Sequence, residues 1–378
     1  MKIIKLLKTI ICIAIIGGFV ACDTEPEALE IQSVKELKAP NKGDEYYANL
    51  RAWKATRPEF GFGWFAGFAD KASSQGSMYN IPDSMGIISI WGGFHPTTNP
   101  LQAKEMYYHQ KICGTKVIKT YLIESSWHWA ADDPRPELQF MQEEWGWDDG
   151  ELRPVDRRVA VTPAQEQAIR AFARSVAEEA ISLGYDGVDM DHEPNNGYGI
   201  KPYILGGYWN RNLIFFDELS KYFGPKSGTG RILALDGEYW AYIPEEIGPM
   251  LDYVIAQAYN CSAEGPVGTS NSLDFRMNRV YTTFPNMSQE KLASMFIVTE
   301  NFESYAQNGG NTGFRTRNNQ VAGYPSSIGM AKWQPLANGV EVRKGGAGTY
   351  HMEYEFNFYK DYKWLREMIN IMATHSND

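Results

Sequence analysis

The chain of 378 residues is 43% hydrophobic and 22% charged, so it can bury a sizeable core without support from disulfides or metals. Its formal charge of −10 at pH 7 leaves no excess of basic residues for a polyanion, which excludes nucleic acid as an expected partner. Removal of the N-terminal signal described next would delete three lysines and no acids, and would lower the formal charge to −13.

The first 21 residues have the pattern of a bacterial lipoprotein signal peptide. Lys2, Lys5 and Lys8 precede an apolar run over residues 9–20, which at about a dozen residues is too short to span a bilayer. The run ends in FVAC, which makes Cys22 the expected lipidated N-terminus. An ordinary secretory peptide with a chance cysteine is the alternative interpretation.

Residues 22–45 are polar and lack periodicity, which predicts a flexible tether. Residues 46–378 contain no internal repeat or low-complexity block, so we expect one folded domain. No second apolar run reaches membrane-spanning length, and any membrane contact is expected through the lipid alone. We expect a monomeric outer-membrane lipoprotein that faces either the cell surface or the periplasm.

Eight apolar, β-rich runs recur along the domain, with helical patterns between most of them. The strands are expected at 60–66, 86–91, 116–123, 185–191, 232–236, 253–259, 295–300 and 347–352. The clearest helix starts at Thr162 as N-cap, with Pro163 in its first turn and Gln165 completing a capping box, and it ends at Gly184. Further helices are expected at 101–112, 209–223, 289–293 and 358–372.

Strands that alternate with helices favour a parallel sheet covered on both faces, and this number of units suits a single (β/α)₈ TIM barrel. An open doubly wound sheet is the alternative, but FGFGWFAGF is not followed by a convincing helix that could bind phosphate. The barrel prediction places each strand's carboxyl end at one rim, where active sites of such barrels lie.

Two connections are long, residues 124–161 after the third strand and 301–346 after the seventh. The first carries Trp127, Trp129, Trp145 and Trp147 with acids between them. Tryptophans on rim loops often stack on sugar rings, because the C–H faces of a sugar are apolar while its edges form hydrogen bonds. Packing of the loop into a small core of its own is the alternative.

The stretch GYDGVDMDHEP, residues 184–194, places four acidic residues in an apolar strand. Because strand side chains alternate, one face carries the row Gly187, Asp189, Asp191 and Glu193, and Glu193 lies at the rim. Neighbouring carboxylates in the row are roughly 6–7 Å apart by strand rise, so they cannot all ionise freely and at least one pKa should be raised. The opposite face carries Asp186, Val188, Met190 and His192, for which we expect structural roles.

This row matches D-G-x-D-x-D-x-E at all five defined positions and resembles the motif of the family 18 glycoside hydrolases. The resemblance extends to QAYN at the end of the sixth strand, where Gln257 and Tyr259 share the inward face. The family's S-x-G-G signature is absent from the third strand, and the nearest match, SIWGG at residues 89–93, lies on the second. The chain lacks room for the inserted domain that many chitinases carry. It therefore looks more like the endo-β-N-acetylglucosaminidases of gut-type Bacteroidetes than like those chitinases.

The resemblance implies substrate-assisted hydrolysis, in which the substrate's own 2-acetamido oxygen attacks the anomeric carbon. Glu193 would be the general acid and base, Asp191 would hold the acetamido N–H, Asp189 would tune Asp191, and Tyr259 would hydrogen-bond the acetamido oxygen. We expect no metal and no cofactor. The candidate substrate-binding residues are Gln257, Trp127, Trp129, Asn260 and Trp240.

Three alternatives stay open on the sequence. A chitinase-like hydrolase of N-acetylglucosamine oligomers would use the same motif. A non-catalytic glycan-binding lipoprotein could use the same barrel, although an intact Glu193 favours an enzyme. A metal site is disfavoured because three carboxylates from one strand cannot surround an ion well.

Two cysteines remain in the mature chain, Cys113 and Cys261. Cys113 precedes the third strand and Cys261 follows the sixth, which places them at opposite ends of the predicted barrel, roughly 20 Å apart by strand rise. A disulfide tolerates a Cα separation of only about 4.4–6.8 Å, so we expect two free thiols.

Overall fold

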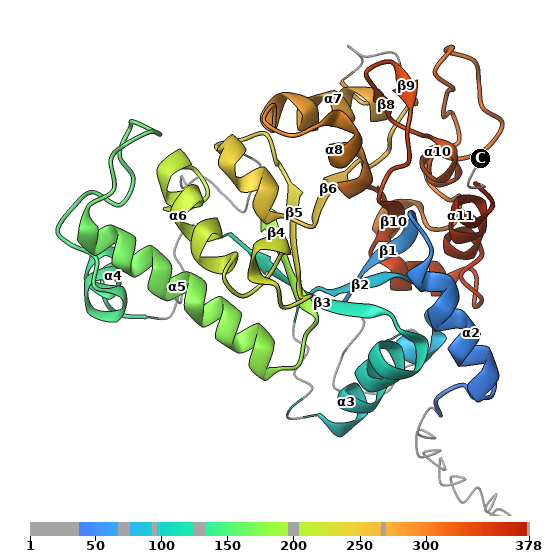
Figure 1. The fold of residues 1–378 in the computed structure, drawn as a ribbon, viewed down its shortest axis with the longest axis horizontal. Helices are drawn as coiled ribbons and strands as arrows, with labels where there is room; N and C mark the ends of the chain where they lie inside the picture. Colours follow the sequence, from blue (N-terminus) through green and yellow to red (C-terminus); the bar gives the residue numbers. More distant parts are fainter. Residues whose placement is uncertain are drawn as a thin grey trace, which may run out of the picture. The chain divides into compact units, whose positions relative to one another are not determined.

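The computed structural model describes residues 38–66, 76–92, 97, 99–123, 133–195, 204–265 and 270–375. Parallel strands in this part form one closed barrel in the order β1-β10-β7-β6-β5-β4-β3-β2 (Figure 1). The predicted (β/α)₈ barrel is therefore confirmed. The strands are β1 (Phe60–Phe65), β2 (Ile87–Ile90), β3 (Lys116–Leu122), β4 (Gly187–His192), β5 (Ile232–Gly237), β6 (Tyr253–Gln257), β7 (Phe296–Asn301) and β10 (Gly346–Tyr350).

The barrel closes where β1 pairs with β10, and glycines make this approach possible. Gly346 and Gly348 face Phe60 and Phe62 across the pair. A Cβ atom at either glycine would collide with the carbonyl oxygen of the residue opposite. The lower barrel interior is apolar and is filled by one cluster of side chains: Phe62, Trp64, Ile87, Ile118, Ile232, Ala234, Ile255 and Ile297.

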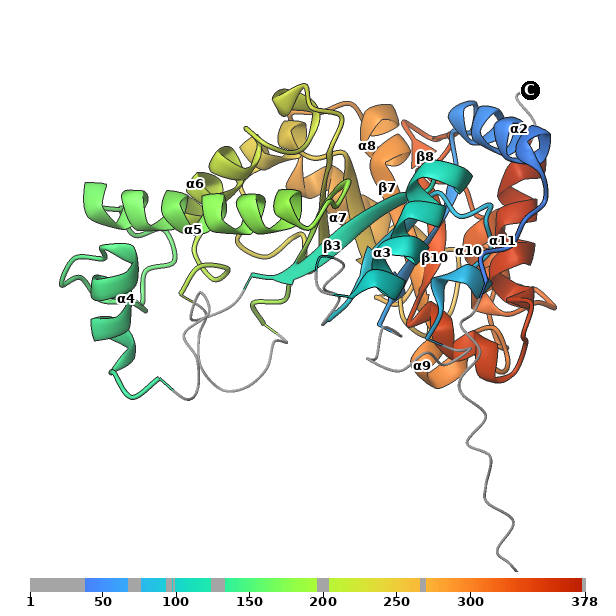
Figure 2. The same ribbon diagram turned by 90° about the horizontal axis from the view of Figure 1, so that it is seen from below.

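The helix before β4 is the one that its capping residues predicted. In α5 (Pro163–Ser182), the Thr162 side chain accepts from the Gln165 N–H and the Gln165 side chain bonds back, which completes the capping box. Its apolar stripe packs on α6 (Trp209–Leu219), where Phe172 and Phe215 stack with ring centroids 5.5 Å apart. Figure 2 shows α5 and α6 together on one side of the barrel, with α11 (Lys363–Thr374) on the other.

Several elements were not predicted, because their sequences lack a strong apolar stripe or are short. The helix α2 (Asp44–Ala55) buries only Tyr47 and Leu50, and it begins inside the segment that was expected to be a tether. The two long connections contain helices and a hairpin rather than loops alone. These are α4 (Glu137–Trp145), α9 (Phe302–Tyr305), α10 (Ser326–Lys332), β8 (Leu336–Ala337) and β9 (Val340–Glu341). A further unpredicted helix, α7 (Leu273–Thr283), lies between β6 and β7.

Other helices differ from the prediction in their bounds. The helix expected at 101–112 is α3 (Pro100–Tyr107), followed by a π-helical turn, η2 (Tyr108–Cys113). The last helix begins at Lys363 rather than 358, because a 3₁₀ segment, η5 (Met352–Asn357), follows β10 and the Glu355 carboxylate accepts the Trp364 N–H at the start of α11. The helix α8 (Gln289–Met295) lies where it was expected.

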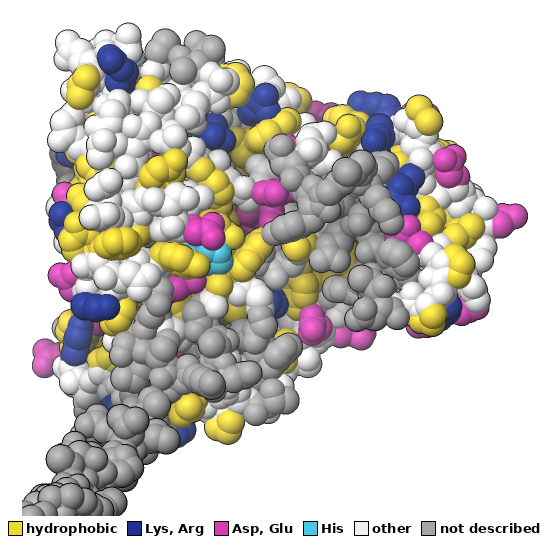
Figure 3. Space-filling view, turned by 180° about the vertical axis from the view of Figure 1, so that it is seen from behind, with side chains coloured by type: hydrophobic (Ala, Val, Ile, Leu, Met, Phe, Trp, Pro, Cys, Tyr) yellow, Lys and Arg dark blue, Asp and Glu magenta, His cyan; other side chains and the backbone are white. Residues whose placement is uncertain are grey.

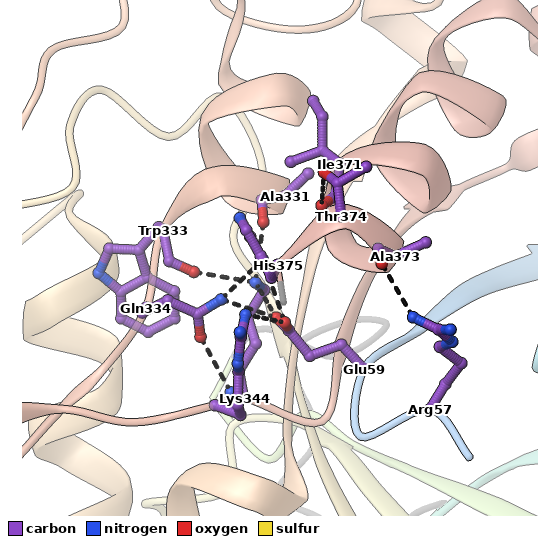
Figure 4. Close-up of polar contacts among 11 residues, drawn as sticks. Arg57, Glu59, Ala331, Trp333, Gln334, Lys344, Ile371, Ala373, Thr374 and His375 are labelled. Atoms are coloured by element: carbon purple, nitrogen blue, oxygen red, sulfur yellow. Dashed lines mark hydrogen bonds and ion pairs between the residues drawn. The ribbon is translucent and has the colours of Figure 1, made fainter. Parts of the chain in front are cut away.

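A buried ion pair joins the start of β1 to the start of β10 at the end of the barrel opposite the acidic rim. Lys344 Nζ lies 2.6 Å from Glu59 Oε1, and both side chains are fully buried. Lys344 also donates to the Ala331 and Trp333 carbonyls, and Gln334 donates to the same Glu59 oxygen. Figure 4 shows Lys344, Gln334 and His375 converging on Glu59.

Two further findings concern membrane-spanning helices and the cysteines. Among the residues that the structure describes, no helix is both long enough and apolar enough to cross a membrane. Cys113 and Cys261 are both buried and free, which agrees with the predicted absence of a disulfide between them.

Figure 3 views the molecule from behind, and near the centre of that face a histidine lies beside acidic and hydrophobic side chains.

Candidate active site

The acidic row of β4 enters the barrel as the alternation predicted. Asp189 is fully buried and Asp191 is 3% exposed, whereas Glu193, just beyond the strand, is half-buried. Burial therefore decreases toward the rim, so that Glu193 has the best access to a ligand. The structure brings the three carboxylates together along one line from the core outward.

Asp189 accepts hydrogen bonds from three other strands through its Oδ2 atom. The donors are Trp64 Nε1 on β1 at 2.8 Å, Ser89 Oγ on β2 at 2.9 Å and, more weakly, Thr120 Oγ1 on β3 at 3.5 Å. Burial raises the pKa of Asp189 to about 6, although these hydrogen bonds oppose the shift. Asp189 therefore titrates near neutral pH.

Asp236 on β5 is a further acid in this site, and it pairs in register with Asp191. It is fully buried. Burial and the charges of Asp189 and Asp191 raise its pKa well above the usual range. Because the charges of Asp189 and Asp236 repel each other in a buried site, the two carboxyl groups cannot both ionise freely.

Gln257 on β6 contacts both Asp191 on β4 and Asp236 on β5, which pair with each other in register. Its Nε2 atom lies 3.1 Å from Asp236 Oδ2 and 3.4 Å from Asp191 Oδ1. Burial, followed by the charges of Glu193 and Asp189, raises the pKa of Asp191 well above its usual value. A proton is therefore held within this group of carboxylates near neutral pH, as the row of acids predicted.

A glycine leaves room for this arrangement. Gly237 ends β5 with φ +83°, a backbone conformation that favours glycine. A Cβ atom there would lie 2.6 Å from the His192 carbonyl oxygen and 3.1 Å from Asp191 Oδ1. Any side chain at this position would displace the acids.

A cavity of about 140 Å³ opens above the acids and is lined largely by aromatic rings. Tyr259 and Tyr350 stack with ring centroids 5.7 Å apart and an interplanar angle of 25°. Burial raises the pKa of Tyr259 well above its usual value, so its hydroxyl keeps its proton and can donate. The lining residues are Trp64, Trp91, Asp191, Glu193, Asp236, Gln257, Tyr259 and Tyr350.

The outward-facing residues of β4 are structural, as expected. His192 is fully buried, its Nε2 atom lies 2.6 Å from the Ala241 carbonyl oxygen, and burial lowers its pKa to about 4, so the ring is neutral at pH 7. Asp186 accepts the Val117 N–H and the Gln110 side-chain N–H, both at 2.9 Å. Neither residue lines the cavity.

The predicted substrate-binding residues are distributed differently from the residues predicted to be catalytic. Gln257 lines the cavity, whereas Asn260 and Trp240 are not among its described lining residues. Asn260 has a left-handed backbone, φ 52°, and its N–H donates to Glu300. Trp240 lines a separate groove. Trp127 and Trp129 lie outside the described residues, as does Cys22.

Sequence reasoning missed Trp64, Trp91, Asp236 and Tyr350, which come from β1, β5 and the ends of β2 and β10. Asp236 had a weak signal, because it is an isolated acid at the end of an otherwise apolar strand, ILALD. Within the described residues, no group of three or more histidines, cysteines or acids is arranged to hold a metal ion.

A family model for "Glycoside hydrolase family 18, BT1044-like" matches residues 24–371. The chain belongs to glycoside hydrolase family 18. It is therefore a hydrolase, and its closed barrel and acidic strand agree with the resemblance inferred from the sequence. Within this family 18 chain, Ser89 of SIWGG reaches Asp189 from β2, so the missing third-strand signature does not leave that aspartate without a serine donor.

A curated relative is endo-beta-N-acetylglucosaminidase F2 of Elizabethkingia meningoseptica, which is 25% identical over 89% of this chain and 86% of its own length. A solved structure of BT1044 superposes with a TM-score of 0.68 at 24% identity and covers 88% of this chain and 93% of its own. An endo-beta-N-acetylglucosaminidase from Cordyceps militaris superposes with a TM-score of 0.55 at 20% identity, over 89% and 97% of the two chains. The solved structures share the fold with this family 18 chain.

Proposed function

We propose that this family 18 hydrolase is an endo-β-N-acetylglucosaminidase that cleaves the GlcNAc-β1,4-GlcNAc core of N-glycans. The observation that carries the proposal is the graded row of carboxylates, with Asp189 and Asp191 buried and Glu193 half-buried at an aromatic cavity. The name of the Elizabethkingia meningoseptica relative supports the substrate class. A chitinase-like hydrolase and a non-catalytic glycan-binding protein are the alternatives.

The proposed reaction is retaining and substrate-assisted. The acetamido oxygen of the sugar attacks its own anomeric carbon while Glu193 protonates the leaving oxygen, which breaks the glycosidic bond and forms an oxazolinium ion. Glu193 then takes a proton from water, which adds to the anomeric carbon from the face that the leaving group vacated. The product keeps the configuration of the substrate, and the enzyme needs no external nucleophile.

The surrounding groups suit the charges that develop. Asp191 can accept the acetamido N–H and stabilise the positive oxazolinium, and the protonated hydroxyl of Tyr259 can donate to the acetamido oxygen. The low exposure of Asp191 strengthens both contacts, because charges interact more strongly away from water. The sugar must be an N-acetylhexosamine, because the reaction otherwise lacks its nucleophile.

The test compares wild type with Glu193→Gln on a high-mannose glycoprotein, a complex-type glycoprotein and a chitin oligomer, with products identified by mass spectrometry. We expect wild type to release N-glycans that retain one N-acetylglucosamine, and the variant to lose activity by about 10²–10⁴-fold while it still binds glycan. Cleavage of the chitin oligomer alone would favour the chitinase alternative. Binding without any release by wild type would favour a glycan-binding protein.

We also propose that the mature chain is anchored to the outer membrane through a lipid on Cys22. The support is the sequence pattern before that residue. Metabolic labelling with a radioactive fatty acid should label wild type and leave Cys22→Ala unlabelled. Equal labelling of both, or labelling of neither, would contradict the anchor.

A further inference from the structure

A groove of about 590 Å³ lies on the outside of the barrel between α6 and α7. Its described lining residues include none of those that line the catalytic cavity. Trp209 begins α6, Trp240 follows the carboxyl end of β5, and both line the groove together with the first turn of η4 (Glu245–Met250). Figure 1 shows α6 and α7 separated by the yellow part of the chain, which contains η4.

Each indole ring of the groove is held beside a guanidinium group. The Arg158 guanidinium carbon lies 4.3 Å from the Trp209 ring centroid, and that of Arg279 lies 4.2 Å from the Trp240 ring centroid. Asn210 fixes the segment that carries Arg158, because its side-chain amide donates to the Arg158 and Val159 carbonyls at 2.9 and 2.8 Å. The two aromatic–cation pairs are therefore preorganised, and both rings are only half-buried.

The charged groups of the groove do not neutralise one another. Neither Arg158 nor Arg279 forms an ion pair or a side-chain hydrogen bond with any described residue, and both guanidinium groups lie over aromatic rings. Glu245 and Glu246 are exposed in the same groove, and their carboxylates likewise have no partner among the described residues. The groove thus offers free donors and free acceptors side by side.

A ligand that fits must present apolar faces to indole rings and groups that both donate and accept hydrogen bonds. A saccharide does this, because its C–H faces are apolar and every hydroxyl group both donates and accepts. A purely anionic ligand would meet Glu245 and Glu246, and an apolar helix would bury four unpaired charges, which is costly. The chemistry of the lining therefore favours a neutral sugar chain.

We propose that this groove is a second carbohydrate-binding site, which holds a neutral branch of the glycan whose core occupies the catalytic cavity. The identity of that glycan rests on the proposed function. Trp240 follows the end of β5, the strand that carries Asp236 of the catalytic cavity. Trp209 begins the helix after β4, so both tryptophans follow the carboxyl ends of the strands that carry the acids, and we expect one branched glycan to reach both sites.

The direct test is calorimetric titration of the full chain with two neutral N-glycans, one high-mannose and one galactosylated, each ending in a single N-acetylglucosamine that leaves no bond to cleave. We expect Trp240→Ala and Trp209→Ala to weaken binding about tenfold or more, since each removes an aromatic platform. Thr282→Arg, at an exposed lining position, should weaken binding by filling the groove without touching the core. Tyr107→Ala, an aromatic residue 59% exposed on α3, is the matched control.

Affinities of all three groove variants within twofold of wild type, for both glycans, would overturn the proposal. The proposal would also be overturned if the groove variants lost as much affinity for an enzymatically deglycosylated glycoprotein as for the glycans, because the groove would then bind polypeptide. In turnover assays, the groove variants should have a lower kcat/KM than wild type on a glycoprotein with branched glycans. On a glycoprotein whose glycans are trimmed to the trimannosyl core, their kcat/KM should equal that of wild type. Absence of glycan release by wild type would contradict the proposed function, whereas the calorimetric result would still decide the groove.

Discussion

Asp189 and Asp236 each have a buried carboxylate oxygen, Oδ1, that accepts no hydrogen bond from any donor group among the described residues. The charges of the two buried carboxylates repel each other, so the pair favours a state in which one of them keeps a proton. Burial raises the pKa of Asp189 to about 6 and that of Asp236 well above its usual value. The pair thus keeps one proton near neutral pH, directly beside Asp191.

The charge coupling of Asp236 with Asp189 and Asp191 makes Asp236 sensitive to substitution. Asp236→Ala removes this charge and the acceptor for Gln257, so kcat should fall about 10²-fold, as for loss of a group that supports acid–base chemistry. Asp236→Asn should lose less, because its amide oxygen can still accept from Gln257. Since that amide does not titrate, the decline of kcat/KM at high pH should be weaker than in wild type. Wild-type rates and pH profile in Asp236→Ala would remove it from the site.

Ser89 should tune the pKa of Asp189. Its hydroxyl group donates to Asp189 at 2.9 Å, and this bond lowers the pKa of that carboxyl. Ser89→Ala should therefore move the inflection of the kcat/KM profile that belongs to Asp189 from about 6 to higher pH. The control is Ser182→Ala on α5, whose hydroxyl group bonds only to the Glu179 carbonyl. An inflection at the same pH in both variants would show that Ser89 does not act on Asp189.

Asp191 should be required for binding of a charged intermediate. A thiazoline derivative of N-acetylglucosamine mimics the oxazolinium ion, and we expect wild type to bind it and Asp191→Ala to bind it poorly. Tyr259→Phe should lose affinity by about one hydrogen bond, or roughly tenfold. Equal affinity of wild type and Asp191→Ala would exclude the proposed role. Isolation of a covalent glycosyl-enzyme would exclude substrate assistance.

The Glu59–Lys344 pair should matter for stability and not for chemistry. Lys344→Met leaves the buried Glu59 carboxylate with the partly exposed Arg343, 3.1 Å away, as its remaining cationic partner, which should lower the free energy of unfolding by about 3 kcal/mol. The double variant Glu59→Gln, Lys344→Met should recover part of this loss in urea unfolding. The kcat of folded Lys344→Met should equal that of wild type, because the pair lies at the opposite end of the barrel from the acidic row of β4.

The Glu59–Lys344 pair also predicts how the stability of the fold changes with pH. Burial raises the pKa of Glu59, but Lys344 together with the hydrogen bonds of Gln334 and His375 outweighs this effect, and the pKa lies below its usual value. The stabilisation is therefore present above the pKa of an unfolded glutamate, about 4.3, and is lost as pH falls through the lower folded value. Glu59→Gln should lose less stability than wild type between pH 5 and about 3. Parallel acid denaturation curves would contradict this.

The two cysteines of the barrel should be unreactive until the chain unfolds. Both are buried, and burial raises the pKa of Cys261 to about 11, so little thiolate is present at pH 7. In a chain of residues 38–378, an aromatic disulfide reagent should react slowly with the native protein. It should titrate two thiols in denaturant without reductant. Absence of reactive thiols in denaturant would mean that a disulfide exists.

The sequence by itself determined the features whose residues are contiguous. The alternation of β4 placed Asp189, Asp191 and Glu193 on one inward face, and the same parity placed Gln257 and Tyr259 on theirs. The capping box at Thr162 set the start of α5. These predictions held because they depend on local backbone geometry, with a period of two in strands and fixed cap positions in helices.

Only the tertiary structure decided which residues from distant strands complete the site. Trp64, Ser89 and Asp236 each stand alone in their segments, and barrel closure is what brings them to Asp189. The raised pKa values likewise come from burial by surrounding strands, which no short stretch encodes. Trp240 was expected to bind the substrate, but it lies in the outer groove, because its position depends on packing against Arg279 of α7, which is distant in the sequence.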